Sequence, residues 1–198
     1  MPGGYARYVL ILMASINFIN YVDRFILPAV ATSIQSEFKI SDTQIGIVAT
    51  SFTLVYAVAA FPFGFWGDRG ARRKVIAFGL AVWSLATLVT GFTRTLPQLL
   101  VSRAVLGIGE ASYYPAGTSL LADHFPKSSR GRAIAIWNAG SVFGIAVGFT
   151  AGGLIAARFG WRTAFFVSGV PGLILAVLAF NMREPARGSV EATATRTR

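Results

Sequence analysis

Long apolar stretches are the dominant feature of this sequence. Four of them contain no charged side chain, and these are residues 43–67, 75–93, 133–157 and 163–182. Two more, residues 8–31 and 97–122, are similarly apolar but contain ionisable residues. A membrane-spanning helix needs about 20 predominantly apolar residues. We therefore expect an all-α membrane protein with six transmembrane helices.

The composition agrees with a membrane-embedded chain. Of the 198 residues, 54% are hydrophobic and 13% are charged, whereas soluble domains contain about 25% charged residues. The connections between the apolar stretches leave no room for a soluble domain, so we assign residues 1–188 to one six-helix bundle. Residues 189–198 are polar and are expected to begin a cytoplasmic linker or tail. The first stretch is too long, and too interrupted by charge, for a cleavable signal peptide.

The positions of the basic residues predict the orientation of the chain. The net charge of +10 arises from 18 Lys and Arg against 8 Asp and Glu. If the N-terminus is cytoplasmic, twelve of the basic residues lie in cytoplasmic segments and four lie on the other side. This bias follows the positive-inside rule, so both termini are expected in the cytoplasm. We expect an integral protein of the inner or plasma membrane, in contact with lipids. The short basic loops argue against nucleic-acid binding.

The sequence offers little for catalysis. It contains no Cys and a single His, His124, which argues against thiol catalysis, a Ser–His relay and a metal site. The Gly107-Ile108-Gly109 segment lacks the third glycine and the preceding strand of a dinucleotide fingerprint. No P-loop and no G-x-S-x-G motif is present. We therefore expect neither an enzyme nor a cofactor.

The two halves of the chain resemble each other. Three residues near the end of the second stretch recur near the end of the fifth at an offset of 89, namely Gly64, Arg69 and Arg73 as Gly153, Arg158 and Arg162. A unit of three helices must be inverted in its second copy. Such 3+3 inverted repeats, with polar sites near the midplane, are typical of secondary transporters. Chance similarity between Gly- and Arg-rich helix ends is the alternative.

Four ionisable residues lie at membrane depth, and these are Asp23, Arg24, Arg103 and Glu110. A charge at the bilayer centre costs about 2.5–3.5 kcal/mol on insertion scales, so such residues usually face a cavity or a partner. Helical spacing places Tyr114 on the face of Arg103 and Glu110, and Asn20 on the face of Arg24. Two pairings, Asp23–Arg103 and Arg24–Glu110, are compatible with the depths of these residues.

We interpret this cluster as a proton-coupling and substrate-cavity site. When one carboxylate takes up a proton, its arginine partner is released and the cavity gains one positive charge. The alternative is a permanent buried ion-pair network that only sets the register of the helices.

Two further motifs are interpreted as mechanical. The loop after the second stretch is predicted to gate conformational change, with a plain basic loop as the alternative, and its residues are Gly64, Asp68, Arg69, Arg72 and Arg73. The flanking glycines Gly64, Gly67 and Gly70 predict close helix packing and a turn. The fifth stretch has a glycine at every fourth position, which predicts a face for close helix packing: Gly140, Gly144, Gly148 and Gly152.

In this order along the chain, the motifs resemble the N-terminal half of a major facilitator superfamily transporter. The resemblance begins with the signature loop, Gly64-x-x-x-Asp68-Arg69-x-x-Arg72-Arg73, although Ala71 stands where most members have Gly. It continues with the fourth-helix motif Arg103-x-x-x-Gly107-x-Gly109 and the fifth-helix glycine series. The Spinster-like branch is similar at four further places, namely Asn20-Tyr21-x-Asp23-Arg24, Gly107-Ile108-Gly109-Glu110-Ala111 with Tyr114-Pro115, Gly160-Trp161-Arg162, and Arg183-Glu184-Pro185.

The resemblance implies alternating access, linked to protons, and lipid-like substrates such as lysophospholipids in the eukaryotic members. It assigns proton coupling to Asp23, Arg24 and Glu110. Superfamily members have twelve helices, so it also implies that a C-terminal six-helix half is missing, through truncation, through a separate second half or through a second copy of this chain. A pore or channel-like subunit and a non-transporting fragment are the alternative functions.

Overall fold

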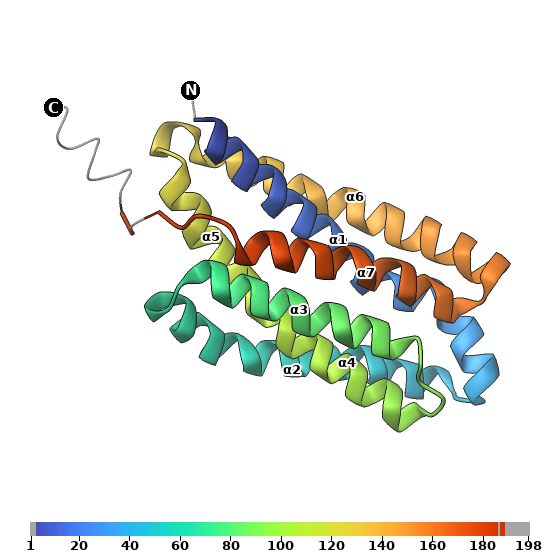
Figure 1. The fold of residues 1–198 in the computed structure, drawn as a ribbon. Coiled ribbons are helices and arrows are strands. Elements are labelled where there is room, and N and C mark those ends of the chain that lie inside the picture. Colours follow the sequence, from blue (N-terminus) through green and yellow to red (C-terminus); the bar gives the residue numbers. More distant parts are fainter. Residues whose placement is uncertain (1–2, 186, 189–198) are drawn as a thin grey trace, which may run out of the picture.

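The computed structural model describes residues 3–185 and 187–188, apart from the side chain of Asp68. In these residues the chain forms helices and no strand (Figure 1), and the helices are α1 (Gly4–Phe38), α2 (Asp42–Arg69), α3 (Arg72–Thr90), α4 (Leu96–Ala111), α5 (Tyr113–His124), α6 (Lys127–Phe159) and α7 (Trp161–Phe180). The all-α prediction is therefore confirmed. Five of these helices, all except α4 and α5, are long and apolar enough to cross a membrane.

The helices extend beyond the apolar stretches. The first is predicted from residues 8–31, whereas α1 has 35 residues and ends at Phe38. At about 1.5 Å per residue such a helix is longer than the bilayer core of about 30 Å. The length of an apolar stretch corresponds to the thickness of the membrane core. The helix itself can be longer, because its backbone hydrogen bonding continues until a local signal ends it. Here that signal is Lys39, which adopts the left-handed conformation with φ of 53°.

The stretch 97–122 is not one continuous helix, in contrast to the prediction. It is divided at Ser112 into α4 with 16 residues and α5 with 12. Pro115 explains the break, because it has no N–H to donate to the carbonyl of Ala111 and its ring crowds that carbonyl. The Ser112 hydroxyl instead donates to the Gly109 carbonyl at 2.8 Å. Together, α4 and α5 take the place of the fourth predicted helix.

Helix contacts follow the inverted repeat. In the repeat, α1 corresponds to α4, α2 to α6 and α3 to α7. The contact of α1 with α6 therefore corresponds to the contact of α4 with α2, and both contacts are present. In the same way the α1–α7 contact corresponds to the α4–α3 contact, and both are present. The α3–α7 contact maps onto itself. In Figure 1, α1, α6 and α7 form one layer and α2, α3 and α4 form the other, and the two layers meet where α7 lies beside α3. The arrangement is the expected 3+3 repeat.

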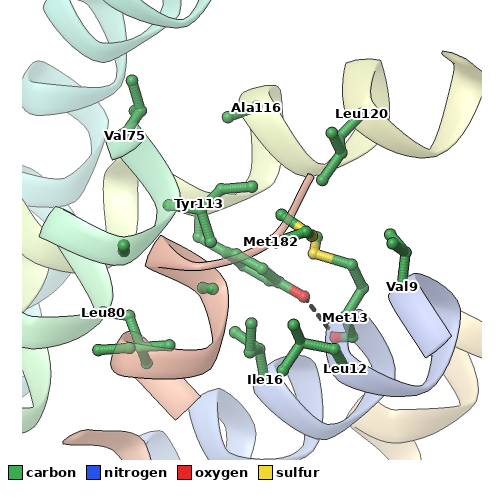
Figure 2. Close-up of a cluster of buried hydrophobic side chains, with 14 of the residues drawn as sticks. Val9, Leu12, Met13, Ile16, Val75, Leu80, Tyr113, Ala116, Leu120 and Met182 are labelled. Atoms are coloured by element: carbon green, nitrogen blue, oxygen red, sulfur yellow. Dashed lines mark hydrogen bonds between the residues drawn. The ribbon is translucent and has the colours of Figure 1, made fainter. Parts of the chain in front are cut away.

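Two apolar clusters divide the bundle along its length. The first contains Leu12, Met13 and Ile16 of α1, packed around Tyr113 (Figure 2). The second contains residues of α1 from Val22 to Ile34, together with Trp161 and Phe165 at the start of α7. Between Ile16 and Val22 the buried face of α1 is polar. The fold therefore positions a polar layer between two apolar layers.

Candidate functional site

The polar layer brings together the ionisable residues that the sequence places at membrane depth. Asp23 of α1 is 0% exposed, and Arg103 and Glu110 of α4 are 2% and 1% exposed. Arg24 is the most accessible of the four, with 25% of its side chain exposed. Because α4 packs between α2 and α3, residues on its inner face lie inside the bundle. The cluster thus has three buried charged groups and one group that reaches the surface.

One of the two pairings that the sequence left open is formed. The Arg24 Nε donates to Glu110 Oε2 at 2.5 Å, a charge-assisted hydrogen bond between α1 and α4. Asp23 and Arg103, although both are described, lie too far apart for an ion pair. Asp23 Oδ2 instead accepts a hydrogen bond from the Thr87 hydroxyl of α3 at 3.2 Å. The two acids therefore have different partners, one charged and one neutral.

Aromatic rings surround the Arg24 guanidinium. Its Cζ lies 5.3 Å from the ring centroid of Tyr21 and 5.1 Å from those of Phe52 and Tyr56. These distances suit cation–π attraction. The sequence analysis did not assign this aromatic cage. Tyr21 is one turn before Arg24, so it could have been found from spacing, but Phe52 and Tyr56 come from α2 and only the helix packing brings them there.

Several polar atoms of the cluster have no partner among the described residues. They are Asn20 Nδ2, Asp23 Oδ1, Arg103 Nε and Nη1, and Glu110 Oε1. Buried polar atoms in native proteins are nearly always hydrogen-bonded, so unpaired ones mark places where a proton, a solute or solvent can interact. The cluster has both donors and acceptors available for this purpose.

Tyr114 lies beside the cluster rather than within it. It is half-exposed on α5, and its ring stacks on Trp137 with centroids 5.0 Å apart. Its neighbour Tyr113 accepts a hydrogen bond from Trp137 Nε1 at 2.5 Å and donates to the Met13 carbonyl at 2.7 Å, as Figure 2 shows for the latter. These bonds join α1, α5 and α6 next to the polar layer.

The predicted gating loop is organised around a buried arginine. The Arg72 side chain is 1% exposed and binds Glu184 at 2.8 Å and, through Nη1, Asp123. Arg73 Nη1 donates to the Phe180 carbonyl at 2.8 Å. The loop is therefore tied to the ends of α5 and α7, and its partners Asp123 and Glu184 were not assigned from the sequence.

The remaining loop residues are more exposed. The Arg69 guanidinium lies 3.5 Å from the centroid of the Phe65 ring. A Cβ atom at Gly64 would meet no atom within 4 Å, so among the described residues no other helix packs closely on this glycine. The side chain of Asp68 lies outside the described residues, as do residues 189–198, the predicted linker.

Hydrogen bonds from Arg72 influence the acids outside the membrane. Burial alone would raise the pKa of the Glu184 carboxyl, but hydrogen bonds from the Arg72 side chain and backbone hold it below its ordinary value of 4.5. The pKa of Asp123 is likewise below 3.8, because the Arg72 guanidinium and the Gly188 N–H outweigh the effect of burial. Both groups are therefore charged at neutral pH.

The glycine face of α6 lies against the backbone of α1. A Cβ atom at Gly140, Gly144 or Gly148 would lie between 2.5 and 2.8 Å from a carbonyl oxygen of α1. At Gly152 the nearest atom is 3.3 Å away. Helices approach this closely only where side chains are small. A side chain at the first three positions would push the two helices apart.

The repeat also produces a clamp at each end of the bundle. At one end, Arg73 Nη1 donates to the Met182 carbonyl at 3.3 Å. At the other end, Arg162 Nη2 donates to the Thr93 carbonyl at 2.9 Å, and both donor and acceptor are offset by 89 residues from the first pair. Arg162 also binds Glu37 at 2.7 Å. Each half thus anchors the last helix of the other.

Comparison with known proteins identifies the family. The family model of the Major Facilitator Superfamily matches residues 13–197. The chain belongs to the major facilitator superfamily. Within the superfamily, this member is similar to the Spinster-like branch: it is 36% identical over 197 residues to protein spinster homolog 1 of Rattus norvegicus, covering 95% of this chain and 36% of that protein. It is 31% identical over 185 residues to protein spinster of Drosophila melanogaster, covering 93% and 31%. The expected family and branch are therefore confirmed.

Other relatives of this superfamily member extend the comparison. A probable L-galactonate transporter of Escherichia coli is 35% identical over 176 residues, covering 89% of this chain and 39% of that protein. A crystal structure of a bacterial homolog to the human lysosomal transporter Spinster, inward-facing and occupied, matches with a TM-score of 0.90 and 31% identity, covering 97% of this chain and 47% of that chain. These homologues are transporters and not enzymes. The superfamily member spans about a third of the length of its curated relatives and about half of the solved structure.

Proposed function

We propose that this chain is the N-terminal half of a secondary active transporter, which moves a small or amphipathic solute by alternating access coupled to protons. The ion pair between Arg24 and Glu110 is the observation that carries this proposal. It joins the two helices, α1 and α4, that correspond to each other in the inverted repeat. An ion pair between two helices that breaks on protonation can change how those helices pack against each other. An ion pair within one helix cannot do so.

The proposed cycle uses the difference in exposure between the two partners. Protonation of Glu110 Oε2 neutralises the acceptor of the Arg24 hydrogen bond, so the guanidinium is released with its positive charge. Arg24 is the more exposed partner, and its aromatic cage keeps it near the surface after release. An anionic group of the solute then replaces the carboxylate. Loss of the proton restores the ion pair and expels the solute.

This cycle favours a solute with an anionic group. The chemistry of Arg24 suits a carboxylate or a phosphate, because a guanidinium donates two parallel hydrogen bonds to either. The L-galactonate in the name of the Escherichia coli relative is a carboxylate. The lysophospholipids implied by the resemblance to the Spinster-like branch carry a phosphate. We therefore propose these two classes as candidate substrates.

We also propose that a second six-helix unit covers one face of the bundle. In the most apolar 18-residue segment of each helix, only 11% of the residues of α2 and 17% of those of α6 are buried inside the bundle. The corresponding fractions are 50% for α1 and 56% for α3. The two helices correspond to each other in the repeat, so their exposed faces are related by symmetry. The greater length of the relatives supports a C-terminal half as the occupant, and a second copy of this chain is the alternative. Both termini are proposed to be cytoplasmic, in an inner or plasma membrane.

Flux measurements test the proposal. The chain is reconstituted in liposomes with trapped pyranine, alone and together with the C-terminal half of a Spinster-like relative. L-galactonate and lysophosphatidylglycerol serve as probes. Uptake that rises with an imposed pH gradient in either preparation supports the transporter. Flux that is independent of the gradient supports a pore, and absence of flux in both preparations supports a non-transporting fragment; either result contradicts the proposal.

A further inference from the structure

We propose that the outer face between α3 and α7 binds an anionic phospholipid of the bilayer, with its headgroup on the basic residues around Arg73 and an acyl chain in an adjoining apolar groove. This site is separate from the Arg24–Glu110 pair, which lies between α1 and α4. Its occupancy does not depend on transport, so the inference stands apart from the proposed function.

The groove provides the apolar half of the site. It has a volume of about 500 Å³ and runs between α3 and α7 near the end where α3 begins and α7 ends. Small residues form its floor, namely Ala77, Ala81 and Ala176. Phe78, Phe180 and Trp66 form its walls. All three aromatic side chains are 40% exposed or more, so the groove opens away from the bundle.

A basic pocket adjoins the groove. It is lined by four arginines and one carboxylate, and these are Arg72, Arg73, Arg183, Arg187 and Glu184. Lys74 lines the groove directly after Arg73, and Asn181 lines the pocket directly after Phe180, so the two hollows share both of their bordering segments. The Arg73 guanidinium lies 5.9 Å from the centroid of the Phe180 ring, at this border. A basic pocket therefore continues into an apolar groove.

The charges of the pocket favour a phospholipid anion. Glu184 and Asp123 are both bound to the buried Arg72. Arg73, Arg183 and Lys74 also line the two hollows, so basic residues outnumber acidic ones there. Basic pockets between transmembrane helices bind anionic headgroups, and each Lys or Arg near the surface contributes to that attraction. Aromatic side chains and a basic residue at the same depth are typical of a membrane–water interface. A phospholipid therefore matches both halves of the site, with an anionic headgroup for the basic pocket and an acyl chain for the apolar groove.

The tryptophans of the chain allow a direct test. Trp66 is 40% exposed, whereas Trp83 and Trp137 are 0% and Trp161 is 4% exposed. Brominated acyl chains quench tryptophan fluorescence on contact, so quenching in vesicles reports on lipid beside Trp66. We would reconstitute the full chain in mixtures of dioleoylphosphatidylcholine and dioleoylphosphatidylglycerol, with one lipid brominated at a time. The ratio of quenching gives the relative binding constant of the two lipids.

We expect phosphatidylglycerol to bind about fivefold more strongly than phosphatidylcholine at low salt, which corresponds to the attraction that about one Lys or Arg near the surface contributes. Lys74→Gln and Arg183→Gln are each expected to bring this ratio toward one, and high salt is expected to lower it. Lys39→Gln removes the same charge at the opposite end of the bundle and is expected to leave the ratio unchanged. Ala81→Phe fills the groove and is expected to reduce quenching by both lipids.

Three results would overturn the proposal. One is an equal binding constant for the two lipids in the unmodified chain. Another is a preference that Lys74→Gln and Arg183→Gln leave unchanged. The third is stronger binding of dioleoylphosphatidylethanolamine than of phosphatidylglycerol, since this would mean that hydrogen bonding to a zwitterionic headgroup decides the site. Trp66→Phe serves as the baseline, because it removes the exposed fluorophore.

Discussion

At the scale of single residues, the two buried acids differ in what holds them. Glu110 accepts a hydrogen bond from a cation, Arg24, whereas Asp23 accepts one from the neutral Thr87. Loss of charge at Glu110 therefore changes the position that Arg24 prefers. Protonation of Asp23 would release no arginine, because its hydrogen bond comes from Thr87. This difference makes Glu110 the better candidate for coupling.

The variant Glu110→Gln tests that assignment. The amide keeps the size of the side chain but cannot take up or release a proton, so we expect pH-driven uptake to fall to the level of empty liposomes. Circular dichroism and gel filtration should show a folded protein. Glu37→Gln makes the same change at an exposed acid and is expected to retain uptake. Coupling that persists in Glu110→Gln would contradict the switch.

A second prediction concerns Glu184, outside the membrane. Because its folded-state pKa is below 4.5, its ion pair with Arg72 stabilises the protein above that pH. This contribution is lost as the pH falls through the lowered pKa. We expect Glu184→Gln to lower the melting temperature in detergent at pH 7, and the difference from the unmodified chain to shrink as the pH is lowered below 4.5 and through the lowered pKa. A difference that does not change with pH would contradict the role of the charge.

At the scale of helices, close packing between α1 and α6 depends on glycines. Gly144 and Gly153 lie in the same helix, but a Cβ atom at Gly144 would lie 2.5 Å from the Phe18 carbonyl oxygen, whereas one at Gly153 would meet nothing within 4 Å. Gly153 belongs to the sequence repeat, because it matches Gly64, whereas Gly144 belongs to the series of glycines at every fourth position. Only one of the two is in a close contact within this bundle.

Alanine substitutions at these two glycines form a matched pair. We expect Gly144→Ala to destabilise the protein by about 1–3 kcal/mol, because the added methyl forces α1 and α6 apart. Gly153→Ala is expected to change stability by less than about 1 kcal/mol, in the stabilising direction, because alanine favours a helix. Unfolding in a mixed-micelle denaturant series measures both. Equal effects would show that the contact with α1 does not limit packing.

At the scale of the whole molecule, the repeat relates the two ends of the bundle. Arg73 and Arg162 each bind a carbonyl at the end of the other half, although their surroundings differ. The Arg73 end includes the buried Arg72 network, whereas the Arg162 end is partly exposed. The clamps keep α3 and α7 together at both ends, so the six helices are expected to move as one unit.

The clamp formed by Arg162 and the Thr93 carbonyl can be tested with a neighbouring arginine as its control. We expect Arg162→Gln to increase hydrogen exchange in the first turns of α7 and the last turn of α3, while stability falls by no more than about 1 kcal/mol, since the pair with Glu37 is partly exposed. Arg158→Gln removes the same charge one turn earlier and is expected to leave exchange there unchanged. Identical exchange in both variants would contradict the clamp.

The class of fold and the members of the polar cluster could be predicted from the amino-acid sequence. Apolar length and the absence of charge are local properties, and they predict membrane helices because the bilayer excludes unpaired polar groups. The inverted repeat could also be read from spacing, as could the faces that carry Arg103 with Glu110 and Asn20 with Arg24. The break at Ser112 was missed although Pro115 signals it, because prolines are tolerated in membrane helices.

The pairing of the charged groups depends on how the helices pack against one another. Spacing along a helix gives the direction of a side chain but not the rotation or depth of the neighbouring helix, so Arg24–Glu110 and Asp23–Arg103 were equally compatible with the sequence. The packing of α2 against α4 brings Phe52 and Tyr56 to Arg24, and the end of α7 brings Glu184 to Arg72. These contacts join residues far apart in the chain, and their geometry depends on the packing of all six predicted helices together.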